Sequence, residues 1–150
     1  MNKASQALLC AAAVPIVSAC ASRATTEPLR GVFLQVASAT TTATEVQQLR
    51  VRATITNDES QRLVVGNCLE PSAVIDSATA TGWVELPSNQ AISLAQCVAP
   101  LAIEARTSQT FDLVFSRANA AARFPRNVPL RLRIMLPDGV AGPVAPLQLP

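Results

Sequence analysis

The stretch that decides the fold of this chain is LRLRIML, residues 130–136. Its apolar residues stand at every second position, and arginine or methionine fills the positions between them. Successive side chains of a β-strand point to opposite faces of a sheet, so this alternation predicts a strand with one buried face and one face in water. We expect this strand to lie in the centre of a sheet.

Shorter or less regular runs of the same kind occur along most of the chain. They predict strands in residues 32–39, 49–55, 63–65, 73–75, 83–86, 101–105, 111–115 and 145–149. Residues 57–60 (NDES) and 138–139 (DG) supply turns, because short polar side chains bond the local backbone. Pro143 and Pro146 mark the last strand as an edge strand. Seven to nine short strands without a long amphipathic helix predict an all-β fold, an antiparallel β-sandwich.

Two segments interrupt the alternation and are expected to be loops. Residues 76–82 separate two short strands. Residues 116–127 contain several alanines that allow a short helical turn, and Phe124 would return this loop to the core. Trp83 is the single tryptophan, and we expect it to fill the core beside a disulfide, as tryptophan does in many sandwich domains.

The first 19 residues have the layout of a secretory signal peptide. Lys3 is followed by an apolar run over residues 7–17, and small residues precede Cys20. The sequence VSAC at residues 17–20 resembles a lipobox, the site at which a bacterial lipoprotein is cleaved and lipidated. We therefore expect a cleaved signal peptide over residues 1–19, a flexible tether over 20–30 and one domain over 31–150, with the lipid on Cys20.

Two other interpretations of the N-terminal segment explain less. A transmembrane helix needs about 20 uninterrupted apolar residues, whereas this run is shorter and contains Pro15. Ordinary secretion would use the small residues Ala19 and Ala21 for cleavage, but it leaves Cys20 without a role. Lipoproteins without aspartate directly after the lipidated cysteine usually go to the outer membrane. Ala21 therefore predicts a protein lipid-anchored in the cell envelope, at the outer membrane if the cell is Gram-negative.

The chain has four cysteines, and the lipobox accounts for two of them. Cys10 leaves with the signal peptide and Cys20 carries the lipid, so Cys68 and Cys97 remain. In an oxidising envelope compartment we expect these two to form a disulfide, which closes a loop of about 30 residues and stabilises the fold by about 3.6 kcal/mol. A zinc site is the rival interpretation, but the chain has no histidine and no Cys-x-x-Cys pair.

Composition excludes several classes of function. Charged residues make up 15% of the chain and the net charge is +2, so no basic surface for nucleic acid is expected. The absence of histidine excludes Ser-His-Asp and Cys-His catalysis. The five glycines are scattered, so no phosphate-binding loop is present. We expect a protein that is not an enzyme, with no catalytic residue, no cofactor and no metal.

Carboxylates are the remaining candidates for chemistry. Asp58 with Glu59, and Glu70 with Asp76, are near enough in sequence to suggest a glycosidase-like pair. Oxygen ligands at residues 57–59 also suggest a calcium site, although the segment does not match a known calcium loop. Carboxylates on strands and turns are more often solvated, and we favour that interpretation for all four.

The pattern of strands, cysteines and tryptophan resembles the immunoglobulin-like domains of small bacterial lipoproteins, and the related proteinase-inhibitor-like sandwich domain. The resemblance covers residues 30–150 and is carried by residues 49–57, Cys68, Gly82-Trp83-Val84, Cys97, 101–115 and 130–136. The chain has no tyrosine, so it lacks the tyrosine corner of immunoglobulin domains. The resemblance therefore implies an immunoglobulin-like sandwich and transfers no functional residue.

Two functions follow as expectations. The first is a non-enzymatic envelope lipoprotein, a binding or structural accessory module that meets the membrane through Cys20 and an envelope protein through its loops. The alternative is a proteinase-inhibitor-like module that inserts an exposed loop, residues 116–127 or 76–82, into a protease. A trypsin-like protease would then recognise Arg117, Arg123 or Arg126.

Overall fold

A computed structural model describes residues 29–43, 47–67, 70–91, 99–119, 121–137 and 140–150 of the chain. Most of these residues form β-strands, and no α-helix occurs among them. The strands are β1 (Val32–Ala43), β2 (Gln47–Asn57), β3 (Leu63–Asn67), β4 (Glu70–Pro71), β5 (Ala73–Thr79), β6 (Gly82–Glu85), β7 (Ser88–Gln90), β8 (Pro100–Ile103), β9 (Thr107–Arg117), β10 (Leu130–Met135) and β11 (Ala141–Leu147).

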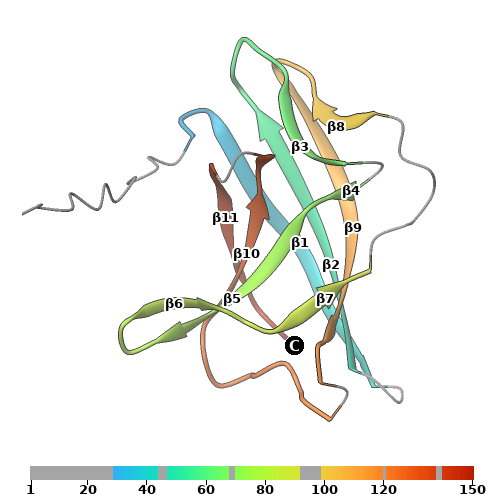
Figure 1. Ribbon diagram of the computed structural model, residues 1–150, viewed down its shortest axis with the longest axis vertical. Helices are drawn as coiled ribbons and strands as arrows, with labels where there is room; N and C mark the ends of the chain where they lie inside the picture. Colours follow the sequence, from blue (N-terminus) through green and yellow to red (C-terminus); the bar gives the residue numbers. More distant parts are fainter. Residues whose placement is uncertain (1–28, 44–46, 68–69, 92–98, 120, 138–139) are drawn as a thin grey trace, which may run out of the picture.

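The strands form three sheets, and their strand pairs are antiparallel (Figure 1). Sheet A has the order β1-β2-β9-β7, sheet B the order β4-β3-β8, and sheet C the order β11-β10-β5-β6. One buried cluster joins them, with Leu113 from sheet A, Val65 from sheet B and Leu132 from sheet C all without solvent exposure. This shared core between opposed sheets confirms the antiparallel β-sandwich.

The stretch LRLRIML forms β10, in the middle of sheet C. Its apolar residues Leu130, Leu132 and Ile134 are buried in the core, while Arg131 and Arg133 lie on the other face. β10 pairs with β11 on one side and β5 on the other. The predicted central strand with one wet face is therefore confirmed.

Two turns differ from the expectation. β5 continues to Thr79 and the chain reverses within Ala80 and Thr81, so the loop expected over residues 76–82 is mostly strand. The sequence also predicts a turn at residues 107–109 (TSQ), between two alternating runs, but the chain turns earlier, at Ala105 and Arg106, where Arg106 takes a left-handed backbone with φ of 61°. Polar residues in both places suggested turns, but cross-strand pairing decides the conformation there.

Phe124 confirms one prediction about the segment before β10. Its side chain is only 2% exposed, and its N–H donates a 2.8 Å hydrogen bond to Oε1 of Gln47. This loop is therefore fixed to the core at its centre. In the same loop, the N–H of Ala122 donates a 2.9 Å hydrogen bond to the carbonyl of Asn119, so the chain makes one short hydrogen-bonded turn there, and the described part of residues 118–129 contains no longer helix.

Trp83 contradicts another prediction, because it does not fill the core. Its side chain is 43% exposed on β6, the edge strand of sheet C. The register places Trp83 beside Ala78, on the face of the sheet that carries Arg131. Its position on an edge strand keeps the indole at the surface.

The predicted signal peptide, residues 1–19, and residues 20–28 of the predicted tether lie outside the described residues. No described helix has the length and apolar character needed to cross a membrane. The described chain begins at Leu29, and the carbonyl of Gly31 accepts a 2.7 Å hydrogen bond from the N–H of Asp58. This bond ties the start of β1 to the end of β2.

Candidate functional site

Charged side chains gather on the outer face of sheet C. Alternation places Arg131 and Arg133 of β10 on this face, and the register brings Asp76 of β5 beside Arg131 and Glu85 of β6 beside Asp76. We call Asp76, Glu85, Arg131 and Arg133 the sheet C ion cluster. Trp83 borders it on β6.

Asp76 is the centre of this cluster. Its side chain is 2% exposed, yet both of its oxygens are hydrogen-bonded. Oδ2 accepts from Nε of Arg131 at 2.8 Å and from Nε of Arg133 at 2.9 Å, and Oδ1 accepts from Nη2 of Arg133 at 2.8 Å. The two-point contact with Arg133 is the strong bidentate geometry of a carboxylate and a guanidinium.

The arginines keep Asp76 ionised. Burial by itself would raise the pKa of the Asp76 carboxyl, but the hydrogen bonds and charges of Arg133 and Arg131 outweigh burial and lower this pKa below its ordinary value. The hydrogen bond to Asp76 likewise raises the pKa of Arg133. Asp76 is therefore a fixed anion at neutral pH, which makes it unsuitable as a general acid or base.

Arg133 directs its donors to three side chains. Besides Asp76, it contacts Oε2 of Glu85 at 3.4 Å through Nη2 and Sδ of Met135 at 3.0 Å through Nη1. Arg131 differs, because only its Nε donates to another described side chain. The terminal nitrogens of Arg131 can therefore donate hydrogen bonds to a group outside the described residues.

Arg131 also stacks on Trp83. The guanidinium carbon lies 4.5 Å from the centroid of the indole ring, which is within the range of a cation–π interaction. Arg131 is thus held by Asp76 on one side and by Trp83 on the other. The result is a surface with a rigid guanidinium beside an exposed aromatic ring, and such a surface is suited to binding.

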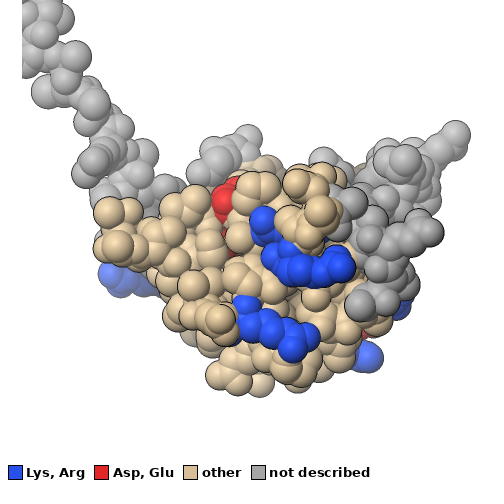
Figure 2. Space-filling model, turned by 90° about the horizontal axis from the view of Figure 1, so that it is seen from below, with Lys and Arg blue, Asp and Glu red and all other residues tan. Residues whose placement is uncertain are grey.

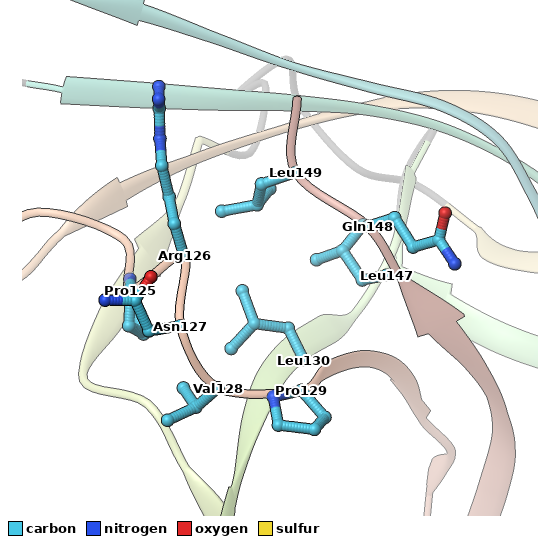
Figure 3. Close-up of a pocket in the computed structure, with 9 residues that line it drawn as sticks. All are labelled: Pro125, Arg126, Asn127, Val128, Pro129, Leu130, Leu147, Gln148 and Leu149. Carbon is cyan, nitrogen blue, oxygen red and sulfur yellow. The ribbon is translucent and has the colours of Figure 1, made fainter.

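A separate hollow of about 450 Å³ lies between residues 125–130 and residues 147–149. Figure 3 shows the side chains of Leu130, Leu147 and Leu149 turned toward its centre, whereas Arg126 extends away. The lining therefore combines apolar side chains with the polar residues Arg126, Asn127 and Gln148.

The carboxylates that the sequence suggested as pairs lie on three separate elements of the fold. Asp58 and Glu59 are exposed in the turn after β2, whereas Glu70 is on β4 of sheet B and Asp76 on β5 of sheet C. Within the described ranges, no three His, Cys, Asp or Glu side chains come together as metal ligands.

At the turn suggested for calcium, the side chain of Asn57 is already occupied by the backbone. Its Oδ1 accepts a 3.1 Å hydrogen bond from the N–H of Glu59. Its Nδ2 donates to the carbonyls of Gln61 at 2.8 Å, Ile103 at 3.1 Å and Glu104 at 3.3 Å. Asn57 therefore acts as a structural link between the end of β2 and the end of β8.

The three arginines suggested for protease recognition have different environments. Arg117 ends β9, its guanidinium carbon lies 5.8 Å from the ring centroid of Phe124, and its Nε and Nη1 are buried. Arg123 and Arg126 are exposed on either side of Phe124. Figure 2 shows basic side chains gathered on this end of the molecule, with little acidic surface beside them.

Cys20, Cys68 and Cys97, the predicted lipidation site and disulfide, lie outside the described residues. The described strands next to the last two are β3 and β8, which pair with Asn67 opposite Pro100. The chain therefore leaves β3 one residue before Cys68 and enters β8 three residues after Cys97, on neighbouring strands.

Comparison with protein-family models, with curated proteins and with solved structures found no match to this chain. The sheet C ion cluster therefore stands on its own geometry. The sequence alone does not reveal this cluster, because its pattern predicts a loop at Asp76 and a core position for Trp83. The available signal was the alternation of Arg131 and Arg133 in LRLRIML, which places two cations on one face.

Proposed function

We propose that this protein is a non-enzymatic binding or accessory module, lipid-anchored in the cell envelope, that binds its partner through the outer face of sheet C. The single observation that carries the proposal is Arg131, held between the buried carboxylate of Asp76 and the exposed ring of Trp83. A fixed guanidinium loses little conformational entropy when it binds. An exposed aromatic ring and an arginine are also the side chains most enriched in the energetic centres of protein interfaces.

The state of Asp76 supports a binding role over an enzymatic one. This buried acid is engaged by two arginines and has a lowered pKa, so its charge is fixed near neutral pH. Catalytic acids and bases instead have a pKa close to the working pH. Asp76 is thus suited to holding a surface in one shape.

The location rests on the lipobox. Cleavage before Cys20 and lipidation of its thiol would leave a short tether ahead of β1, and Ala21 favours the outer membrane in a Gram-negative cell. The pairing of β3 with β8 beside Cys68 and Cys97 supports the proposed disulfide. In this proposal the disulfide belongs to an immunoglobulin-like domain held at a membrane surface.

Two experiments test the proposal separately. Cys20→Ala should release the protein from washed membranes and abolish incorporation of labelled palmitate, whereas retention on the membrane would contradict the anchor. For the binding face, a photo-crosslinking residue at Val144, which is exposed beside Arg133, should capture an envelope protein. The same residue at Thr54 on sheet A should not capture it, and Trp83→Ala should abolish capture at Val144. Equal capture from both faces would contradict the binding site.

A proteinase-inhibitor-like module is the second candidate, and the fixation of Phe124 favours it. Phe124 holds the loop before β10 against the core, so Arg123 and Arg126 stand on a constrained, exposed segment. Inhibition of a trypsin-like protease at micromolar protein, lost in Arg123→Ala or Arg126→Ala, would support this function. Absence of inhibition across a panel of serine proteases would reject it.

A further inference from the structure

Strand β6 is an open edge of sheet C. It is the last strand in the order β11-β10-β5-β6, and all four of its residues are exposed. Two of them are large and apolar, with Trp83 43% and Val84 53% exposed. Figure 1 shows the β5–β6 hairpin projecting from the body of the molecule. An exposed apolar edge of this kind is a template for pairing with another strand.

The hydrogen-bond pattern shows which backbone groups face outward. The N–H of Leu86 donates to the carbonyl of Ile75 at 2.7 Å, so residues 82, 84 and 86 direct their peptide groups toward β5. The residues between them, Trp83 and Glu85, therefore direct their N–H and C=O groups toward the open side. These four groups have no partner in sheet C.

We propose that β6 pairs with β6 of a second copy of this chain, antiparallel, about a two-fold axis at Val84. In this register Trp83 of each copy faces Glu85 of the other, and the two pairs exchange four backbone hydrogen bonds. Val84 faces Val84 of the second copy. A two-fold contact is self-complementary in this way because each surface meets its own equivalent.

Side-chain chemistry selects this register. A register that placed Glu85 opposite Glu85 of the second copy would oppose like charges, which destabilises a cross-strand pair. The proposed register instead covers the two exposed apolar side chains. It places each Glu85 beside the Trp83 of the other copy, whose ring already carries the guanidinium of Arg131.

The ends of β6 limit the contact to these residues. Pro87 has no N–H to donate, and Gly82 has a φ of 134°, which is outside the conformation of an extended strand. A contact this short buries much less than the roughly 800 Å² per partner of a stable interface. The proposed dimer is therefore weak in dilute solution and is favoured at high local concentration.

A cysteine at the two-fold axis tests the pairing in the full chain. Val84 has its peptide groups turned toward β5, so the pair of Val84 residues is of the non-hydrogen-bonded type, with Cα atoms about 4.5 Å apart. This separation is within the range of a disulfide. Val84→Cys should therefore form a disulfide-linked dimer under mild oxidation, detected on a non-reducing gel against the unsubstituted chain.

Two matched variants control for accidental cross-linking. Glu85→Cys is on the same exposed strand, but its equivalent in the second copy is two residues out of register, beyond the reach of a disulfide. Thr81→Cys lies in the exposed turn before β6 and is farther from the axis. We expect the dimer yield of Val84→Cys to exceed that of either control at least fivefold.

The outcomes decide the proposal. Adding Glu85→Pro to Val84→Cys removes an outward N–H without touching the bonds to β5, so it should reduce the dimer to the control level, and circular dichroism should show an intact fold. Equal yields for Val84→Cys and Glu85→Cys, or a cross-link to a different protein in place of the second copy, would overturn it. The measurement is repeated with Cys20→Ala, so a failure of the proposed anchor does not affect the result.

Discussion

β2 of sheet A and β10 of sheet C have nearly the same sequence, but the outer faces of their sheets differ in structure. β2 contains LRVRATI, with Arg50 and Arg52 between buried residues, and β10 contains LRLRIM, with Arg131 and Arg133 in the same places. On sheet A, Nε of Arg52 lies 3.9 Å from Oδ1 of Asp112, and the two side chains are 60% and 73% exposed. On sheet C, the corresponding acid is 2% exposed and binds two arginines at 2.8 to 2.9 Å.

The difference comes from the lateral neighbours and not from the strand itself. Asp112 and Asp76 each face an arginine across a strand pair, in register with Arg52 and Arg131. Asp76 is also reached by Arg133 on the diagonal, and Trp83 and Glu85 of β6 border the site. An identical alternation can therefore form a solvated surface or an ordered site, depending on which strands pair beside it.

Removal of the central acid is expected to have the largest effect. Asp76→Asn leaves two half-buried guanidinium groups without their anion, so we expect the free energy of unfolding to fall by about 3 kcal/mol. This value is near the lower end for breaking a buried ion pair, because both arginine side chains remain partly exposed to water. Asp112→Asn on sheet A should change it by less than about 0.5 kcal/mol. Urea unfolding at pH 7, followed by far-ultraviolet circular dichroism, measures both, and equal losses would contradict the contrast between the faces.

Acid should act on the same site. The pKa of Asp76 is lowered in the folded protein, so its contribution to stability is present above the unfolded-state pKa of about 3.9 and is lost as pH falls through the lower folded pKa. When the pH falls from 7 to below the folded-state pKa of Asp76, the free energy of unfolding should therefore decrease more in the unsubstituted protein than in Asp76→Asn. Parallel stability curves for the two proteins across this range would refute the assignment.

A smaller effect is expected at the aromatic border of the cluster. Trp83→Leu removes the stacking partner of Arg131 and should cost about 1 kcal/mol. Phe33 is the matched control on sheet A, since it is also exposed and no cation lies over its ring among the described contacts. Phe33→Leu should stay within about 0.5 kcal/mol in the same unfolding measurement.

The hydroxyl pairs of sheet A should contribute least. Thr54 and Thr110 lie 2.9 Å apart through their Oγ1 atoms, and both are open to water. Replacing both by valine keeps the shape and the strand propensity, so stability should change by less than about 0.5 kcal/mol. A loss close to that of Asp76→Asn would show that sheet A depends on its polar face as much as sheet C does.

Local pattern was enough to predict the strands that bury one face. β10, β2 and the core side of β9 follow alternation that only one register satisfies, because a slip by one residue would expose every apolar side chain. Phe124 was also predicted to enter the core, as an isolated aromatic residue in a polar loop. These features depend on where apolar residues stand in the chain.

The site depended on information that a local pattern does not contain. Asp76 looks like a turn residue until β10 pairs with β5 and supplies two arginines. Trp83 looks like a core residue until β6 is found at the edge of sheet C. Both follow from the order of strands in the sheet, which is set by contacts far apart in sequence.

The surface position of Trp83 also determines what optical spectroscopy will report. The chain has one tryptophan and no tyrosine, so its intrinsic fluorescence arises from a single indole beside Arg131, outside the hydrophobic core. The quenching and the emission wavelength of Trp83 should therefore change when another strand pairs with β6. Melting of the core, by contrast, will produce only a muted fluorescence change and is better followed through the backbone.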